Sequence, residues 1–358
     1  FTGPSPVQDL KAEYVGVTSV NLAWTVTDSA SNSYTYRIEV ANGTSVWNAT
    51  SNATKVEIIE LIPGTLYNFT VFAAVNDSQT EGEGVSIALY TRPSPVQDLK
   101  AEYVGVTSVN LAWTVTDSAS NSYTYRIEVA NDTSVWTVMS NATKVKIIEL
   151  IPGTLYNFTV FAAVNDSQTE GEGVSIVLYT KPSPVQDLKA EYVGVTSVNL
   201  AWTVTDSASN SYMYRIEVAN DTSVWNATSN ATKVKITELI PGTLYNFTVF
   251  AAVNDSQTEG EGVSIVLYTR PNPVQDLKAE YVGVTSVNLA WTVTDSASNS
   301  YTYRIEVAND TSVWTVMSNA TKVEIIELIP GTLYNFTVFA AVNDSQTEGE
   351  GVSIVLYT

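Results

Sequence analysis

A heptapeptide of sequence LIPGTLY, first present at residues 61–67, restricts the fold most because it recurs three more times at a constant spacing. The interval is 89 residues, so the final tyrosines of the four copies are Tyr67, Tyr156, Tyr245 and Tyr334. This period is too long for a solenoid unit, which has roughly 20–50 residues, and suits a small domain with its own core. We therefore predict four domains, at residues 5–93, 94–182, 183–271 and 272–358.

The heptapeptide has the composition of a tight turn between two strands. Pro63 and Gly64 favour a turn, Leu61 is placed to fill the core, and Tyr67 opens the next strand. This arrangement is typical of a tyrosine corner, in which the ring packs inward and the hydroxyl group forms a hydrogen bond with the backbone a few residues upstream.

Alternating apolar residues predict short strands throughout each repeat, and no segment has helical periodicity. In the first repeat, Trp24 is expected at the centre of the core. Residues 45–47 are expected to form a short strand that gives way to a polar stretch, and Leu61 is expected to end the fifth strand. The seven predicted strands comprise residues 5–12, 20–24, 34–40, 45–47, 56–61, 67–75 and 85–90.

The connections between repeats are short and contain proline. Residues 1–4 (FTGP) align with YTRP at 90–93 and YTKP at 179–182, which indicates the end of an upstream repeat, with a cloning remnant as the alternative. Proline restricts the backbone of these connections, so the domains are expected to form an extended rod.

Composition argues against several classes of function. The chain has no Cys and no His, which removes thiol nucleophiles, imidazole bases and the usual zinc and copper ligands, so we predict neither an enzyme nor a cofactor. The net charge of −20 disfavours nucleic acid and anionic membranes as partners. No apolar run approaches the roughly 20 residues that span a bilayer, so direct membrane insertion is not expected. The carboxylates of EGEG at 81–84 lack the ligand spacing of a calcium loop and favour a solvated loop.

Several residues together resemble the signature of the fibronectin type III family, four times along the chain. They are Trp24 on the second strand, Tyr36 on the third, and the pattern LxPGTxY at 61–67. An immunoglobulin domain would usually carry its Trp on the third strand beside a Cys pair, whereas this chain has no Cys. The resemblance implies an all-β, immunoglobulin-like sandwich of seven strands, with a sheet of the first, second and fifth strands facing a sheet of the fourth, third, sixth and seventh.

Asn-x-Ser/Thr sequons are more frequent than chance predicts, because five of the seven Asn residues in the first repeat begin one. Their number predicts an exported protein that carries N-linked glycans. The alternative, Asn as turn chemistry, suits Asn42 and Asn76 but not Asn68, which lies within a predicted strand. The eighteen candidates are Asn42, Asn48, Asn52, Asn68, Asn76, Asn131, Asn141, Asn157, Asn165, Asn220, Asn226, Asn230, Asn246, Asn254, Asn309, Asn319, Asn335 and Asn343.

One surface patch is a candidate ligand site. Arg37, Trp47 and Phe72 are expected near the third and sixth strands, with Arg37 over an aromatic ring. The alternative is that these side chains pack on each other beneath glycans.

The combination of YxY on the third strand, IPGTLYNFT and the YTRP connection resembles the ectodomains of receptor-type tyrosine phosphatases, the eta type and its close relatives in particular. The resemblance implies a segment of a single-pass plasma-membrane protein whose catalytic domain lies elsewhere. We expect an extracellular, semi-rigid spacer that also presents a surface for a protein ligand or for self-association. The alternative is an adhesive or ligand-binding surface of a cell-adhesion or matrix protein.

Overall fold

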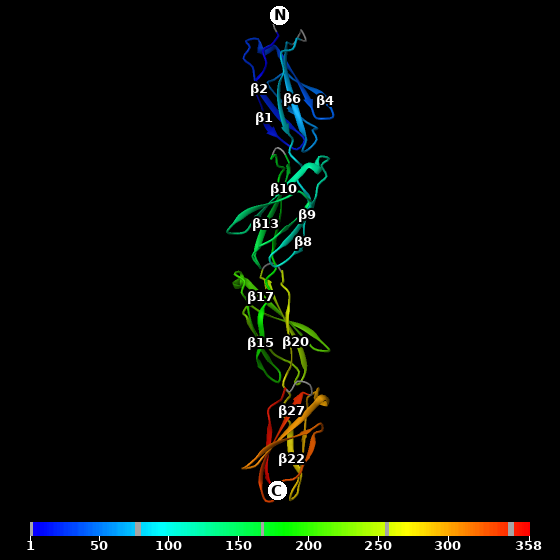
Figure 1. Cartoon of the computed structure of the whole chain (residues 1–358), viewed down its shortest axis with the longest axis vertical. Helices are drawn as coiled ribbons and strands as arrows, with labels where there is room; N and C mark the ends of the chain where they lie inside the picture. Colours follow the sequence, from blue (N-terminus) through cyan, green and yellow to red (C-terminus); the bar gives the residue numbers. More distant parts are fainter. Residues whose placement is uncertain (1–2, 76–79, 166–167, 255–257, 343–346) are drawn as a thin grey trace. The chain divides into compact units, whose positions relative to one another are not determined.

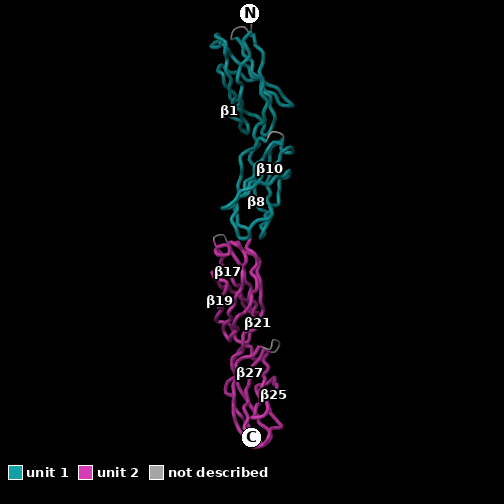
Figure 2. The backbone as a smooth tube through the Cα atoms, turned by 60° about the vertical axis from the view of Figure 1, so that its left-hand side comes forward, with its two compact units in different colours: residues 1–180 teal, residues 181–358 magenta. Residues whose placement is uncertain are grey.

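The computed structural model describes residues 3–75, 80–165, 168–254, 258–342 and 347–358 (Figure 1). The chain divides into two compact units, residues 1–180 and residues 181–358, and each unit contains two repeats (Figure 2). The units are described separately below.

The first repeat of unit 1 is a sandwich of two antiparallel sheets, and a 3-10 turn, η1 (Ser31–Ser33), precedes the third strand. One sheet has the order β1-β2-β5 and the other β4-β3-β6-β7, which confirms the all-β fold that the resemblance implied. The strands are β1 (Gln8–Val15), β2 (Val20–Thr25), β3 (Tyr34–Ala41), β4 (Val46–Ser51), β5 (Lys55–Ile58), β6 (Leu66–Val75) and β7 (Val85–Tyr90).

The second repeat of unit 1 has the same topology, with sheets β12-β9-β8 and β11-β10-β13-β14. Its elements are β8 (Gln97–Val104), β9 (Val109–Thr114), η2 (Ser120–Ser122), β10 (Tyr123–Ala130), β11 (Val135–Ser140), β12 (Lys144–Ile147), β13 (Leu155–Val164) and β14 (Val174–Tyr179).

Unit 2 contains two further sandwiches of this kind. The first comprises β15 (Gln186–Val193), β16 (Val198–Thr203), η3 (Ser209–Ser211), β17 (Tyr212–Ala219), β18 (Val224–Ser229), β19 (Lys233–Ile236), β20 (Leu244–Val253) and β21 (Val263–Tyr268). The second comprises β22 (Gln275–Val282), β23 (Val287–Thr292), η4 (Ser298–Ser300), β24 (Tyr301–Ala308), β25 (Val313–Ser318), β26 (Lys322–Ile325), β27 (Leu333–Val342) and β28 (Val352–Tyr357).

The core of each sandwich lies between the two sheets because successive strand residues point to opposite faces. In the first repeat, Val20, Leu22 and Trp24 of β2 are buried, and the residues between them are more exposed. The Trp24 ring meets Tyr36 of the other sheet edge to face, with 5.1 Å between ring centroids. The predicted central position of Trp24 is therefore confirmed.

The tyrosine corner is also confirmed. The Tyr67 hydroxyl accepts a hydrogen bond from the backbone N–H of Ile62 at 2.9 Å, and the Tyr67 side chain is buried. Gly64 adopts a φ of +59°, a left-handed conformation that L side chains rarely adopt. The same hydrogen bond recurs at Tyr156, Tyr245 and Tyr334.

Three predicted strands had wrong boundaries, among them β1, which comprises Gln8–Val15 rather than residues 5–12. Strand β4 does not end at Trp47 but continues to Ser51, because it pairs with β3 along its whole length. Strand β5 ends at Ile58, since Glu60 has a φ of +57° and turns the chain before Leu61 returns to the core. Strand β1 begins at Gln8 rather than before the prolines, which lack the N–H that a sheet ladder needs.

In unit 1, the connection between the two repeats is held by hydrogen bonds at successive residues. The buried hydroxyl of Thr91 donates to the carbonyl oxygen of Ile62 at 2.6 Å and accepts from the N–H of Thr65 at 3.0 Å. The Arg92 N–H donates to Gly16 of the first repeat, and Arg92 Nε donates at 2.8 Å to the carbonyl oxygen of Glu170 in the second.

The second repeat contributes a buried tyrosine to this junction. Gly64 lies so close to Tyr123 that an added Cβ would overlap the hydroxyl group of Tyr123. That hydroxyl donates to Asp117 at 2.7 Å, and the Ser94 N–H donates to the same carboxylate at 2.8 Å. Burial and the bond to Asp117 raise the pKa of Tyr123. In unit 2, Arg270 contacts Glu348 and Gly242 contacts Tyr301 in the same way.

Candidate interaction surfaces

The outward face of the four-stranded sheet carries an arginine whose guanidinium N–H groups are largely hydrogen-bonded within the repeat. The Arg37 guanidinium lies 4.1 Å from the centroid of the Phe72 ring. Its Nε and Nη2 donate to the two carboxylate oxygens of Glu81 at 2.7 and 2.8 Å, and Glu39 lies 3.5 Å from Nη1. This bidentate geometry fixes a charge-assisted contact between β3 and the segment after β6.

The hydrogen bond between the two groups lowers the pKa of Glu81 and raises that of Arg37. The same arrangement recurs in the other repeats, where arginine stacks on phenylalanine and pairs with glutamate. The members are Arg126, Phe161 and Glu170, then Arg215, Phe250 and Glu259, then Arg304, Phe339 and Glu348. Because its charges are paired with one another, this cluster holds Glu81 and the equivalent glutamates against the neighbouring strand.

Trp47 does not belong to this cluster, so the predicted three-residue patch is not assembled. Trp47 pairs with Val40, whose side chain faces the core, and its ring meets Tyr67 edge to face at 6.0 Å between centroids. Arg37 and Phe72 lie on the opposite face of the same sheet. The prediction was wrong because it placed the Trp47 ring on the outward face, whereas the alternation of side chains along β4 directs this ring toward the core.

In the acidic segment at 81–84, Glu81 is engaged by Arg37. Within the described parts of the chain, no group of three or more Asp or Glu side chains is arranged to hold a metal ion.

The described sequons lie on the four-stranded sheet and in the turns at its ends. Asn68 is exposed on β6 with its side chain on the face opposite to the buried Tyr67, and Asn157, Asn246 and Asn335 are equivalent. Asn48 lies on β4, where its Oδ1 accepts a hydrogen bond from Arg37 at 3.0 Å. Asn42 and Asn52 lie in the turns that precede and follow β4. Asn76 and Asn343 lie outside the described residues.

Sequence reasoning missed a second surface, the outward face of the three-stranded sheet, which we call the lysine face. In the first repeat it presents Lys11 and Glu13 from β1 and Lys55 and Glu57 from β5, all exposed. Asn21 of β2 lies between them. Alternation indicates that charged residues two apart on one strand point to the same side, but the rows that they form across strands depend on the register.

The fibronectin type III domain model matches residues 5–87, 94–177, 183–266 and 272–354. The chain belongs to the fibronectin type III family. Among curated relatives, receptor-type tyrosine-protein phosphatase eta of Gallus gallus is 65% identical over 355 residues, which are 99% of this chain and 25% of that protein. Phosphatase eta of Mus musculus is 31% identical over 97% of this chain and 28% of that protein. A solved two-domain fibronectin type III segment of chicken tenascin has 21% identity, covers 49% of this chain and 99% of that segment, and has a TM-score of 0.35.

The chain spans about a quarter of the length of these phosphatase relatives. It corresponds to the extracellular fibronectin type III region of receptor-type phosphatases, and the matched repeats contain no catalytic domain. None of the described residues belongs to a helix with the length and apolar character needed to cross a bilayer.

Proposed function

We propose that this fibronectin type III chain is an N-glycosylated stalk segment of a single-pass receptor-type tyrosine phosphatase, and that it acts as a semi-rigid spacer. The observation that carries the proposal is the junction within each unit. Thr91 and Arg92 are hydrogen-bonded to the first repeat, Arg92 also reaches the second, and Gly64 contacts Tyr123 across the junction. A connection bonded on both sides has little free length, as a spacer requires.

Deletion of two repeats tests the spacer. The chain and a variant lacking residues 94–271 would be displayed on cells through the same transmembrane anchor, facing a supported bilayer. We expect the shorter variant to enter close contacts that exclude the full chain, because exclusion depends on height. Equal exclusion of the two forms would contradict the proposal.

Occupancy of the sequons tests the glycosylation separately. In protein from animal cells, site-resolved mass spectrometry should find glycans at the four exposed strand positions, Asn68, Asn157, Asn246 and Asn335. We expect occupancy at these positions because the four asparagine side chains point outward from β6 and the equivalent strands. Unmodified asparagine at all four positions would refute this part of the proposal.

A further inference from the structure

The basic residues of the chain are divided between the two sheets by type. Ten of the eleven lysines lie on strands of the three-stranded sheets, and the eleventh, Lys181, lies in a connection. Four of the six arginines lie on the four-stranded sheets, where each is paired with glutamate. Of the described lysines, Lys278 has an ion-pair partner, Glu280 at 3.9 Å. The lysine faces therefore carry charge that the fold itself scarcely uses.

In the first repeat, these charges form two rows across the sheet. Lys11 is opposite Ala23, which is opposite Lys55, so one row has a lysine at each end. In the second row, Asn21 is opposite Glu57 on one side and the exposed Tyr14 of β1 on the other, where the strand has a register shift, and the adjacent Glu13 lines the same hollow as Asn21. The rows are two residues apart along the strands, or roughly 7 Å.

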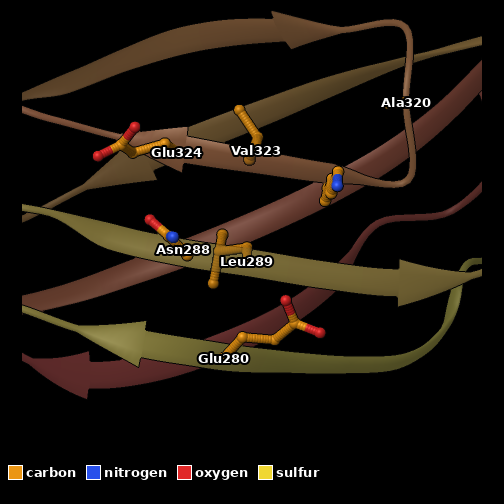
Figure 3. Close-up of a pocket in the computed structure, with 7 residues that line it drawn as sticks. Glu280, Asn288, Leu289, Ala320, Val323 and Glu324 are labelled. Carbon is orange, nitrogen blue, oxygen red and sulfur yellow. The ribbon is translucent and has the colours of Figure 1, made fainter.

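The fourth repeat has the same two rows. Figure 3 shows Glu280, Asn288 and Glu324, which come from the neighbouring strands β22, β23 and β26. These residues line a hollow of about 440 Å³. The lysine row consists of Lys278, Ala290 and Lys322, by the same strand pairing. No sequon begins on β22, β23 or β26, or on β1, β2 or β5. N-linked glycans would therefore be attached outside these strands, and the sequons nearest to this face are those of Asn52 and Asn319, whose next residues, Ala53 and Ala320, line the edge of the hollow.

We propose that the lysine face of the first and fourth repeats binds the same face of a second copy of this chain. A copy turned by 180° about an axis that lies in the interface, parallel to the sheet and to the rows and midway between them, brings its lysine row over the glutamate row of the first. Lys11 then meets Glu13 of the copy and Lys55 meets Glu57 of the copy, and each pair occurs twice. The contact is self-complementary, as a twofold interface requires.

The second and third repeats differ at one position that decides whether they can pair. Lys146 and Lys235 replace the residue equivalent to Glu57. In the same arrangement, Lys146 would face Lys144 of the copy, and like charges in contact are unfavourable. The charge pattern thus restricts pairing to the outer two repeats, which share Glu57 and Glu324.

Each contact is expected to be weak, because exposed ion pairs contribute little individually. A dissociation constant on the order of 1 mM is expected for a single pair of faces. Two competent repeats per chain and many chains on one surface would raise the apparent affinity through effective concentration. This proposal depends on the proposed glycosylation in one respect, that the glycans leave the lysine face accessible. It does not depend on the spacer role.

A charge exchange between two variants tests the proposal. The first variant carries Lys11→Glu, Lys55→Glu, Lys278→Glu and Lys322→Glu; the second carries Glu13→Lys, Glu57→Lys, Glu280→Lys and Glu324→Lys. Full-length glycoprotein from animal cells would be coupled to beads, and bead aggregation would be measured at low and high salt. We expect wild-type beads to aggregate. Beads that carry either variant alone should aggregate at least tenfold less, and a mixture of beads that carry the two variants should recover the aggregation.

If aggregation depended only on the net charge of the chain, the expected result would be the opposite, so the experiment distinguishes net charge from pairing of the lysine faces. Each Glu→Lys substitution changes the charge by two, and four of them move the chain from −20 to −12, which lowers general repulsion. If general charge governs aggregation, the second variant alone aggregates most. That result, or wild-type beads that stay dispersed, or a mixture that fails to aggregate, would overturn the proposal. So would aggregation of wild-type beads only after heparin is added, which would indicate an anionic polymer as the occupant.

All eight substituted side chains are exposed, and melting curves would establish that the variants are folded. A milder pair of variants, with the same lysines or the same glutamates changed to glutamine, covers the case in which charge reversal prevents folding. Each glutamine variant should lose aggregation, and their mixture should recover part of it, because the lysine row that one variant keeps still faces the glutamate row that the other keeps. Wild-type aggregation by either glutamine variant would equally refute the proposal.

Discussion

Both sheets of each repeat carry charged residues on their outward faces, but, among the described residues, the charges are paired on one face and largely unpaired on the other. On the four-stranded sheet, Arg37 stacks on Phe72 and is held by Glu81, so charge stabilises the fold. On the three-stranded sheet, Lys55 and Glu57 project from one strand and stay exposed. The difference shows that charges paired within a domain support its stability, whereas exposed rows of charge remain available to another molecule.

The largest expected effect comes from placing a glycan on the lysine face, which would block its contact with another molecule. Ala23→Thr and Ala290→Thr would create sequons at Asn21 and Asn288, in the middle of the two faces. We expect bead aggregation to be abolished in protein whose new sites are occupied by mass spectrometry, because the glycan separates the faces. The matched control adds Asn21→Gln and Asn288→Gln, which removes the sequons and should restore wild-type aggregation.

Removing the arginine should have the next largest effect. Changing Arg37, Arg126, Arg215 and Arg304 to Ala removes ring stacking and a bidentate ion pair, and should lower the free energy of unfolding by about 1–2 kcal/mol per repeat. For domains of this size, each kcal/mol corresponds to a fall in Tm of roughly 4–8 °C. The matched control changes Lys55, Lys144, Lys233 and Lys322 to Ala and should cost less than about 0.5 kcal/mol per repeat. Equal losses in calorimetry would contradict the comparison.

The pH dependence of the first repeat should show a smaller effect of the same contact. The pKa of Glu81 is lowered by the hydrogen bond from Arg37, so its stabilising contribution is complete above the usual value of 4.5 and is lost as pH falls through the lower folded pKa. Hydrogen exchange of the β3 amides should therefore distinguish Glu81→Gln from wild type at neutral pH, and this difference should shrink near pH 3. If the difference in exchange between Glu81→Gln and wild type grew as the pH fell, the predicted direction of the pH effect would be wrong.

Much of the fold could be predicted from the sequence because period-two alternation and the turn residues are local signals. Trp24, Tyr67 and the outward direction of Asn68 follow directly from them. Trp47 was placed wrongly because the polar residues after it hid the continuation of β4, in which Trp47 and Ala49 pack toward the core.

The rest could not be predicted because it depends on contacts between distant residues. Arg37 and Glu81 are 44 residues apart, and nothing in their spacing pairs them. The lysine face needs the register of β1, β2 and β5 before its rows appear, and that register includes a shift between Ala12 and Tyr14. The family resemblance supplied the order of the strands but not the chemistry of their outward faces.

The hydrogen bonds of Thr91 also have a mechanical consequence. Because the hydroxyl of Thr91 is bonded to both ends of the tyrosine-corner turn, a pull along the chain at this residue loads Ile62 and Thr65 at once. Tension would then pass into the folded turn instead of first straightening slack between repeats. Under load, such a junction should give way together with the end of the domain that holds it, so that extension proceeds in whole-domain steps.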